Sequence, residues 1–270
     1  MREWLGGLAG VAMIASALCS APALAQSNSV RTPDLYRLLK LDGNLVRWQN
    51  VQGEPVTITY KVLIEFQAFS GARNCRRMTG IDGLAQRSGI DTIQFDTALR
   101  DAFAMWEEAA NIRFREAEPG EPANIAIGAQ QEPEGWAFAD VFYDARSDGQ
   151  FKPISQALVC LNPEKLWKVG FDGDLKTYDL RYTLAHEIGH AIGLDHPSNG
   201  DQIMNYRYEE RFSELQSGDV SGAATLYGAP QPRESIVARA HRMHPAPAPG
   251  QQSSTMTRAL NPPRDAQTPR

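Results

Sequence analysis

One stretch of this sequence decides how the rest of the chain is read: His186-Glu187-Ile188-Gly189-His190-Ala191-Ile192-Gly193-Leu194-Asp195-His196. It has the spacing HExxHxxGxxH and gathers three of the chain's five histidines into eleven residues. The other two, His241 and His244, lie in a proline-rich segment near the carboxyl end. The histidines of the folded part of the chain are therefore expected to form a single site.

The spacing of these residues predicts a metal site with a base beside it. Residues four positions apart share a helix face, so His186 and His190 would present their imidazoles to one point. Gly193 lets the chain leave the helix in a conformation that other residues resist, and the turn would return His196 as a third ligand. Three neutral histidines with an open coordination position suit a catalytic Zn²⁺. Glu187, next to the first ligand, is placed to take a proton from a water molecule at the zinc.

The amino-terminal residues have the layout of a secretory signal peptide. Arg2 precedes an apolar run over 4–18, and Ala23-Leu24-Ala25 supplies a cleavage site before Gln26. A membrane anchor is the alternative, but the run is short for one. We therefore predict export, to the medium or the periplasm, with no stable membrane insertion once residues 1–25 are removed. The net charge of −5 argues against nucleic-acid binding, and we expect a monomer.

Removal of a signal peptide would leave two cysteines, Cys75 and Cys160, because Cys19 lies within it. In an exported chain two cysteines most simply form a disulfide. Two buried thiols are the alternative.

Hydrophobic patterning predicts several strands and three helices. The alternating residues 56–62 form the first strand, and a long loop is expected from there to Ile90. A helix is expected from Asp96, as its N-cap, to Ala110. Further strands are expected at 112–114, 124–127, 136–143 and 154–161, and further helices at 180–192 and within 213–227.

These elements divide the chain into four parts. Residues 1–25 form the signal peptide, and 26–50 form either a pro-segment or an N-terminal extension. Residues 51–228 form the zinc-binding domain. Residues 229–270 are rich in proline and are expected to be a disordered tail.

The run HEIGHAIGLDH resembles the zinc signature of the metzincin metallopeptidases, and most closely that of the matrixin branch. Met204 corresponds to the methionine of the turn that underlies the zinc in that clan. The resemblance implies an α+β fold with two long helices, a C-terminal helix after the Met-turn, and a twisted mixed sheet of about five strands with an antiparallel edge strand. It implies a zinc endopeptidase of proteins or peptides, with Glu187 as base and the substrate bound along residues 136–143.

Several positions depart from the matrixin pattern. No histidine precedes His186, so the family's second, structural zinc cannot be built in the same way. Ca²⁺ stays open, with loop ligands among Asp140, Asp144, Asp148, Asp172 and Asp174.

The control of the site also departs from the pattern. Cys75 lies after the first strand, where pairing with Cys160 is preferred over a role as a latency switch. Asp42 is a conceivable switch residue instead.

Tyr206, two residues after Met204, matches the astacin and serralysin branches. There the corresponding tyrosine approaches the zinc and can contact the transition state. A wall position in the specificity pocket is the alternative for Tyr206.

Two other functions stay open at this point. One is a zinc hydrolase that cuts peptide cross-links of the cell wall. The other is a non-catalytic binding module on a metzincin-like fold, which is weakened by the presence of every catalytic position.

Overall fold

A mixed sheet forms the centre of the protein, whose computed structural model describes residues 35–49, 55–198 and 200–231. Four strands run parallel to one another in the order β7 (Ile112–Glu116), β4 (Val56–Val62), β8 (Ile125–Gln130) and β10 (Phe151–Leu161). All six residues of β8 are buried, as is usual for an inner strand of a parallel sheet. Strand β9 (Ala137–Tyr143) pairs antiparallel with β10 and forms an edge of the sheet.

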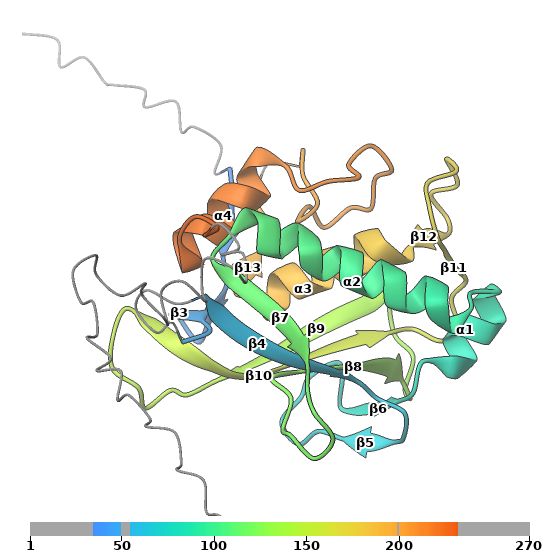
Figure 1. Cartoon of the computed structure of the whole chain (residues 1–270), viewed down its shortest axis with the longest axis horizontal. Coiled ribbons are helices and arrows are strands. Elements are labelled where there is room, and N and C mark those ends of the chain that lie inside the picture. Colours follow the sequence, from blue (N-terminus) through green and yellow to red (C-terminus); the bar gives the residue numbers. More distant parts are fainter. Residues whose placement is uncertain (1–34, 50–54, 199, 232–270) are drawn as a thin grey trace, which may run out of the picture. The chain divides into compact units, whose positions relative to one another are not determined.

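Helices α2 (Thr92–Ala109) and α3 (Leu180–Ala191) lie together over one face of the sheet (Figure 1). Trp106 of α2 is fully buried between them, and its indole N–H donates to the carbonyl oxygen of Ala185 at 2.9 Å. Helix α4 (Ser217–Tyr227) packs against α2. The predicted α+β class, with an antiparallel edge strand and a C-terminal helix, is confirmed.

Helix α2 begins four residues before the predicted start, so the assignment of Asp96 as its N-cap was wrong. The cap is Asp91, whose carboxylate accepts from the backbone N–H of Gln94 at 2.7 Å. The side-chain oxygen of Gln94 accepts in return from the N–H of Asp91 at 2.9 Å. This reciprocal capping box starts the helix upstream of its strongest apolar pattern.

The region from residue 63 to 90 is not the single loop that was predicted. It contains β5 (Gln67–Ala68), β6 (Arg77–Thr79) and α1 (Asp82–Ser88). Strand β6 pairs antiparallel with the end of β8, through Met78 opposite Gln130. These elements are too short to produce a readable periodicity, and the pairing that stabilises them is distant in sequence.

Residues 35–49 carry β1 (Arg37–Leu38), β2 (Lys40–Leu41) and β3 (Asn44–Arg47). Asp42 and Gly43 join β2 to β3 with φ values of 49° and 83°, as in the two-residue type I′ turn of a β-hairpin. Strand β3 pairs parallel with the start of β10. Strand β1 pairs antiparallel with β13 (Leu194–Asp195), within the histidine motif.

A disulfide joins Cys75, in the loop before β6, to Cys160 near the end of β10. Strands β11 (Trp167–Lys168) and β12 (Tyr178–Asp179) form a small parallel pair ahead of α3. Strand β10 begins three residues before its predicted start, and α4 lies within the predicted range of 213–227.

The expected signal peptide and nearly all of the expected tail lie outside the described residues. Within the described part of the chain, no helix has both the length and the apolar character needed to cross a membrane.

Candidate active site

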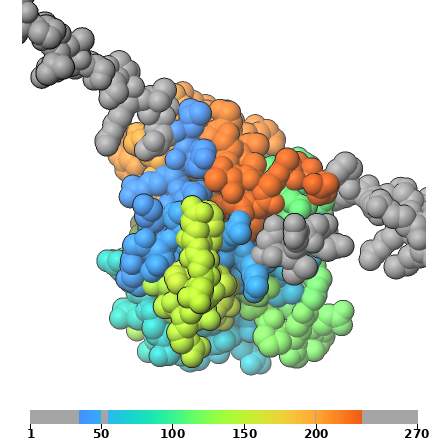
Figure 2. Space-filling view, turned by 90° about the vertical axis from the view of Figure 1, so that its left-hand side faces the viewer, coloured from blue at the N-terminus to red at the C-terminus, as the bar shows by residue number. Residues whose placement is uncertain are grey.

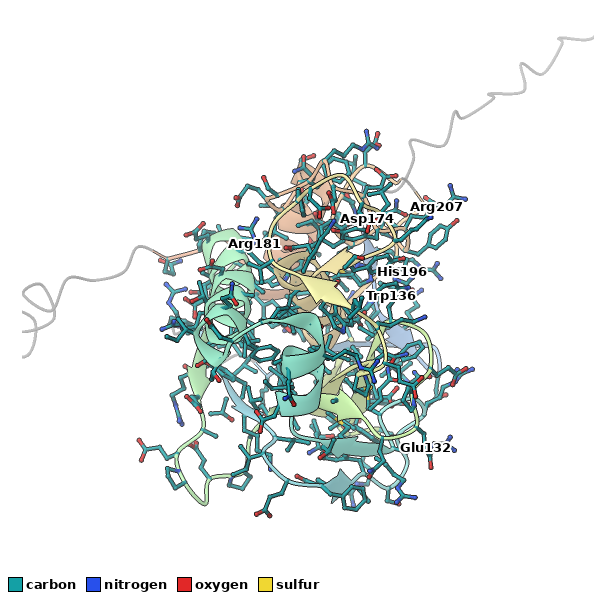
Figure 3. All side chains as sticks on the ribbon, turned by 90° about the vertical axis from the view of Figure 1, so that its right-hand side faces the viewer. Glu132, Trp136, Asp174, Arg181, His196 and Arg207 are labelled. Carbon is teal, nitrogen blue, oxygen red and sulfur yellow. A yellow bond between two sulfur atoms is a disulfide. The ribbon has the colours of Figure 1, made fainter. Side chains whose placement is uncertain are left out.

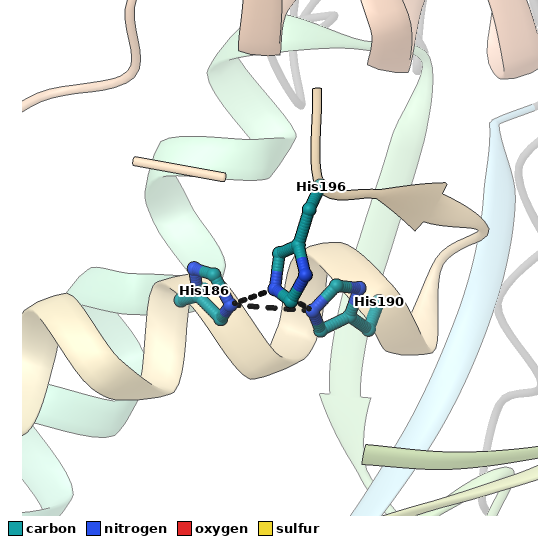
Figure 4. A group of neighbouring side chains, drawn as sticks. All are labelled: His186, His190 and His196. Carbon is teal, nitrogen blue, oxygen red and sulfur yellow. Dashed lines mark hydrogen bonds between the residues drawn. The ribbon is translucent and has the colours of Figure 1, made fainter. Parts of the chain in front are cut away.

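The three histidines of the motif meet at one point. His186 and His190 project from successive turns of α3, and His196 approaches from the residue after β13 (Figure 4). Their Nε2 atoms lie 3.0 Å apart for His186 and His196, 3.2 Å for His186 and His190, and 3.1 Å for His190 and His196. Tetrahedral ligands at a Zn–N distance of 2.0–2.1 Å would be about 3.3 Å apart. The spacing of these nitrogens therefore fits one zinc ion.

The opposite ring nitrogens support the same conclusion. Nδ1 of His186 lies 2.8 Å from the carbonyl oxygen of Ile203, and Nδ1 of His190 lies 2.9 Å from that of Leu194. A carbonyl only accepts hydrogen bonds, so each Nδ1 carries the proton and each Nε2 presents a lone pair. Lone pairs turned toward one another at these distances repel unless a cation lies between them. The donor set thus suits a metal ion, with the carbonyls orienting the ligands.

Burial keeps these imidazoles in the neutral form that binds metal. It lowers the pKa of His186 well below its ordinary value, with a further contribution from neighbouring His190. Burial, followed by the charge of His196, lowers the pKa of His190 to about 4. The pKa of His196 is lowered for the same main reason, against the opposing effect of Asp195. The three imidazoles are therefore neutral near pH 7, and their Nε2 lone pairs are available to a cation.

Glu187 lies in the same cavity and is 7% exposed. Burial raises the pKa of its carboxyl group to about 8. A dication nearby would favour the carboxylate instead. The side chain can therefore exchange a proton near neutral pH, as a general base that later acts as an acid must do.

Residues that flank α3 in the sequence fix where the helix begins and ends. At its start, the carboxylate of Asp179 accepts from the backbone N–H of Tyr182 at 2.7 Å, an N-cap that the sequence reading missed. At its end, Gly193 has a φ of 103°, which allows the reversal that returns His196. A Ser/Thr/Asp/Asn cap before an apolar periodic run is the signal that could have located Asp179.

Met204 is almost fully buried and lies against α3 at Gly189. A Cβ atom added to Gly189 would overlap the sulfur of Met204 and come within 2.8 Å of Cζ2 of Trp106. Gly189 thus lets the methionine approach α3 closely.

The turn that carries Met204 is held by Asp219 of α4, a residue missed in the sequence. Asp219 is fully buried, and its carboxylate accepts from the backbone N–H groups of Ile203, Met204 and Gln216. Nothing local in the sequence distinguishes it from an ordinary acidic residue in the first turn of a helix.

A cavity of about 700 Å³ extends over the histidines and along β9. Trp136 and His196, both labelled in Figure 3, line this cavity. Trp136 stacks on Tyr178 with ring centres 3.9 Å apart, and Tyr178 stacks on Tyr208 at 4.2 Å. This aromatic stack forms one end of the cleft. Its members are far apart in sequence, so no pattern could have grouped them.

Tyr206 also lines the cavity, but it is 65% exposed and its ring centre lies 6.4 Å from that of His196. Its hydroxyl oxygen accepts a hydrogen bond from Nε of Arg207 at 2.7 Å. The position is compatible with either role considered for this residue.

Asp140, one of the five candidate calcium ligands, has another function in the fold. It accepts from the backbone N–H groups of Arg73, Asn74 and Cys75 at 2.7–2.8 Å and so holds the disulfide loop against β9. Asp172 forms an ion pair with Lys168. Within the described residues, the five aspartates do not form a group with the spacing of a shared ion site, whereas the three histidines do.

Three named relatives show what this chain is similar to. It is 32% identical to metalloendoproteinase 1-MMP of Arabidopsis thaliana, over 61% of this chain and 47% of that protein. It is 30% identical to macrophage metalloelastase of Rattus norvegicus, over 52% of this chain and 30% of that protein. It is 25% identical to karilysin of Tannerella forsythia, over 53% of this chain and 30% of that protein. The chain thus spans less than half the length of each of these relatives.

A family model gives the broadest match. The model of matrixin, peptidase M10, matches residues 82–228, which include α2, all three histidines, Met204 and α4. This range is more than half of the 270 residues. The chain therefore belongs to the matrixin family of peptidases.

Proposed function

We propose that this protein is an exported zinc-dependent endopeptidase that hydrolyses peptide bonds, with Glu187 as the general base. One observation carries the proposal: three Nε2 lone pairs converge in a cavity that also holds the Glu187 side chain. Membership of the matrixin family supports the same reaction class. Because the match covers only part of the named relatives, their substrates are not transferred to this chain.

The residues of the site have separate roles in the proposed reaction. A zinc ion held by His186, His190 and His196 would polarise the scissile carbonyl and lower the pKa of a water molecule toward 7. Glu187 would accept the proton of this water as its oxygen attacks the carbonyl carbon. The same carboxyl group would then give the proton to the leaving amine.

The edge of the sheet supports a protein or peptide as the substrate. Among the described residues, β9 pairs only with β10, and its residues Ala137–Phe142 line the cavity. Backbone groups at such an edge can pair with an extended peptide. Tyr206 as a contact to the transition state, and Ca²⁺ at the loop aspartates, stay predictions.

Replacement of the base tests this function. Glu187→Gln keeps the size of the side chain but removes its basicity, so turnover should fall by about a hundred- to ten-thousandfold. Zinc content, measured by mass spectrometry, should stay at the wild-type level. Glu108→Gln is a matched control, because Glu108 is exposed on α2. Glu187→Gln that still cleaves at the wild-type rate would contradict the mechanism.

The substrates should be a mixed peptide library and purified peptidoglycan, assayed in parallel. A chelator should abolish cleavage and added Zn²⁺ should restore it. Cleavage of peptidoglycan alone would favour the cell-wall alternative. Zinc content near zero, with no cleavage, would favour a binding module. Amino-terminal sequencing of protein recovered outside the cytoplasm tests the expected loss of residues 1–25.

A further inference from the structure

We propose that residues 35–49 are a permanent part of the catalytic unit, and that Leu39 and Leu41 form the cleft wall that contacts the substrate on one side of the scissile bond. This inference rests on the proposed peptidase function. It assigns a role to a segment that, from sequence, is equally readable as a removable pro-segment.

The segment contributes to the core of the domain. Strand β3 extends the central sheet beside β10, with Leu45 opposite Phe151 and Val46 opposite Lys152. Val46 and Trp48 are 0% and 5% exposed. Removal of the segment would expose the apolar surface that these two side chains cover and would leave the start of β10 without this partner.

The segment also satisfies carbonyl groups at the end of the zinc-ligand helix. The indole N–H of Trp48 donates to the carbonyl oxygen of Ala191 at 3.0 Å, and the backbone N–H of Leu39 donates to that of Gly193 at 2.8 Å. The last carbonyls of a helix have no partner within the helix. In this protein Trp48 supplies one such donor, and Leu39 supplies another to Gly193 in the turn that follows the helix.

The turn inside the motif is shaped to accept this segment. A Cβ atom at Gly193 would lie 2.6 Å from the carbonyl oxygen of Val46, so a glycine is needed there for close approach as well as for its φ. Strand β1 pairs with β13, and Arg37 forms an ion pair with Asp195 at 3.0 Å. The segment therefore packs directly against the turn that places His196.

The turn between β2 and β3 is hydrogen-bonded to the end of β9. The hydroxyl group of Tyr143, the last residue of β9, donates to the carboxylate of Asp42 at 3.0 Å. Figure 2 shows residues 35–49, in blue, beside the yellow-green β9–β10 region and beside orange-red helix α4. Asp42 is outside the set of residues that line the cavity, which argues against the latency role considered for it.

Between these anchors, Leu39 and Leu41 face the cleft. Both are half-buried, and both line the same cavity as His190, Asp195 and His196. They lie toward the Tyr143 end of β9, opposite the aromatic stack near Trp136. A peptide substrate that binds antiparallel to β9 would have the residues before its scissile bond at this end. The two leucines are therefore expected to favour large apolar residues there.

The test compares Leu39→Ala and Leu41→Ala with Lys40→Ala, an exposed neighbour, in the full-length chain. Each is assayed on a peptide library varied on both sides of the scissile bond, and the mass of the active species is measured. We expect active protein that retains residues 35–49. For both leucine variants, kcat/KM should fall roughly tenfold on substrates with large apolar residues before the scissile bond. Preferences after the bond and zinc content should match those of Lys40→Ala.

Three results would overturn the inference. They are an active species that begins after residue 49, a rise in activity in the leucine variants as expected of an inhibitory segment, and an unchanged cleavage profile. A wild-type chain that cleaves no peptide would overturn the proposed function itself. A wild type that cleaves, while both leucine variants keep its profile, would overturn this inference alone.

Discussion

Asp219 of α4 accepts a hydrogen bond from the backbone N–H of Met204 at 3.1 Å. The same carboxylate accepts from the N–H of Ile203, and the carbonyl oxygen of Ile203 in turn faces Nδ1 of His186. A continuous set of hydrogen bonds therefore leads from the C-terminal helix, through the methionine turn, to His186, a proposed metal ligand. The orientation of His186 depends on a residue 33 positions away in the chain.

Asp219→Ala should weaken both the fold and the metal site. It removes the acceptor of two buried N–H groups, those of Ile203 and Met204, and of the half-buried N–H of Gln216, so the free energy of unfolding should fall by about 3 kcal/mol. Zinc affinity should fall about ten- to a hundredfold, because the carbonyl of Ile203 would no longer be held in place. Denaturant unfolding and chelator competition measure the two effects. Asp201→Ala, at an exposed ion pair with Arg211, should change neither. Unchanged zinc affinity in Asp219→Ala would show that the turn is held by other contacts.

Gly189→Ala should be destabilising by about 1–3 kcal/mol, since the new methyl group would overlap Met204. Met204→Ala would leave space in that position. The double variant should therefore be more stable than the sum of the two single changes predicts, a coupling that a double-mutant cycle measures by denaturant unfolding. Simple additivity would mean that Met204 and Gly189 do not compete for the same space.

The disulfide between Cys75 and Cys160 closes a loop with a sequence separation of 85 residues. Cys75→Ala with Cys160→Ala should lower the free energy of unfolding by about 2–5 kcal/mol, because the unfolded chain gains conformational freedom. A reductant should lower the Tm of the wild type toward that of the double variant and leave the double variant unchanged. Sensitivity of the double variant to reductant would point to an effect unrelated to this bond.

Tyr206→Phe distinguishes the two roles of this exposed residue of the cleft. If the hydroxyl group contacts the transition state, kcat should fall about tenfold or more while KM and zinc content stay the same. Arg207→Ala serves as a control for the hydrogen bond that the hydroxyl makes in this structure. A change confined to substrate preference would assign Tyr206 to the wall of the pocket.

The candidate active site was predictable from sequence because its geometry is local. His186, Glu187 and His190 share one short helix, and Gly193 makes the turn that returns His196, so eleven residues contain most of the site. Strand β4 and the apolar face of α2 were predictable for a similar reason, as their periodicity is expressed within each element.

Other features were less visible although they also left a local signal. Asp91 with Gln94, and Asp179, are helix caps that the apolar pattern overshadowed. The Asp42-Gly43 pair is a hairpin signal, but the strands on either side of it are two and four residues long. Such short strands are stable only when another part of the chain pairs with them.

By itself, the sequence determined the fold class and pointed to the proposed metal ligands and base, since helix periodicity and turn geometry act over a few residues. Only the tertiary structure decided which distant residues support and bound that site. It placed Asp219 under the methionine turn, stacked Trp136 on Tyr178, and packed Val46 and Trp48 against the end of the zinc-ligand helix. The physical reason is that burial and hydrogen-bond satisfaction of these groups depend on partners far away in the chain, and no local pattern specifies such partners.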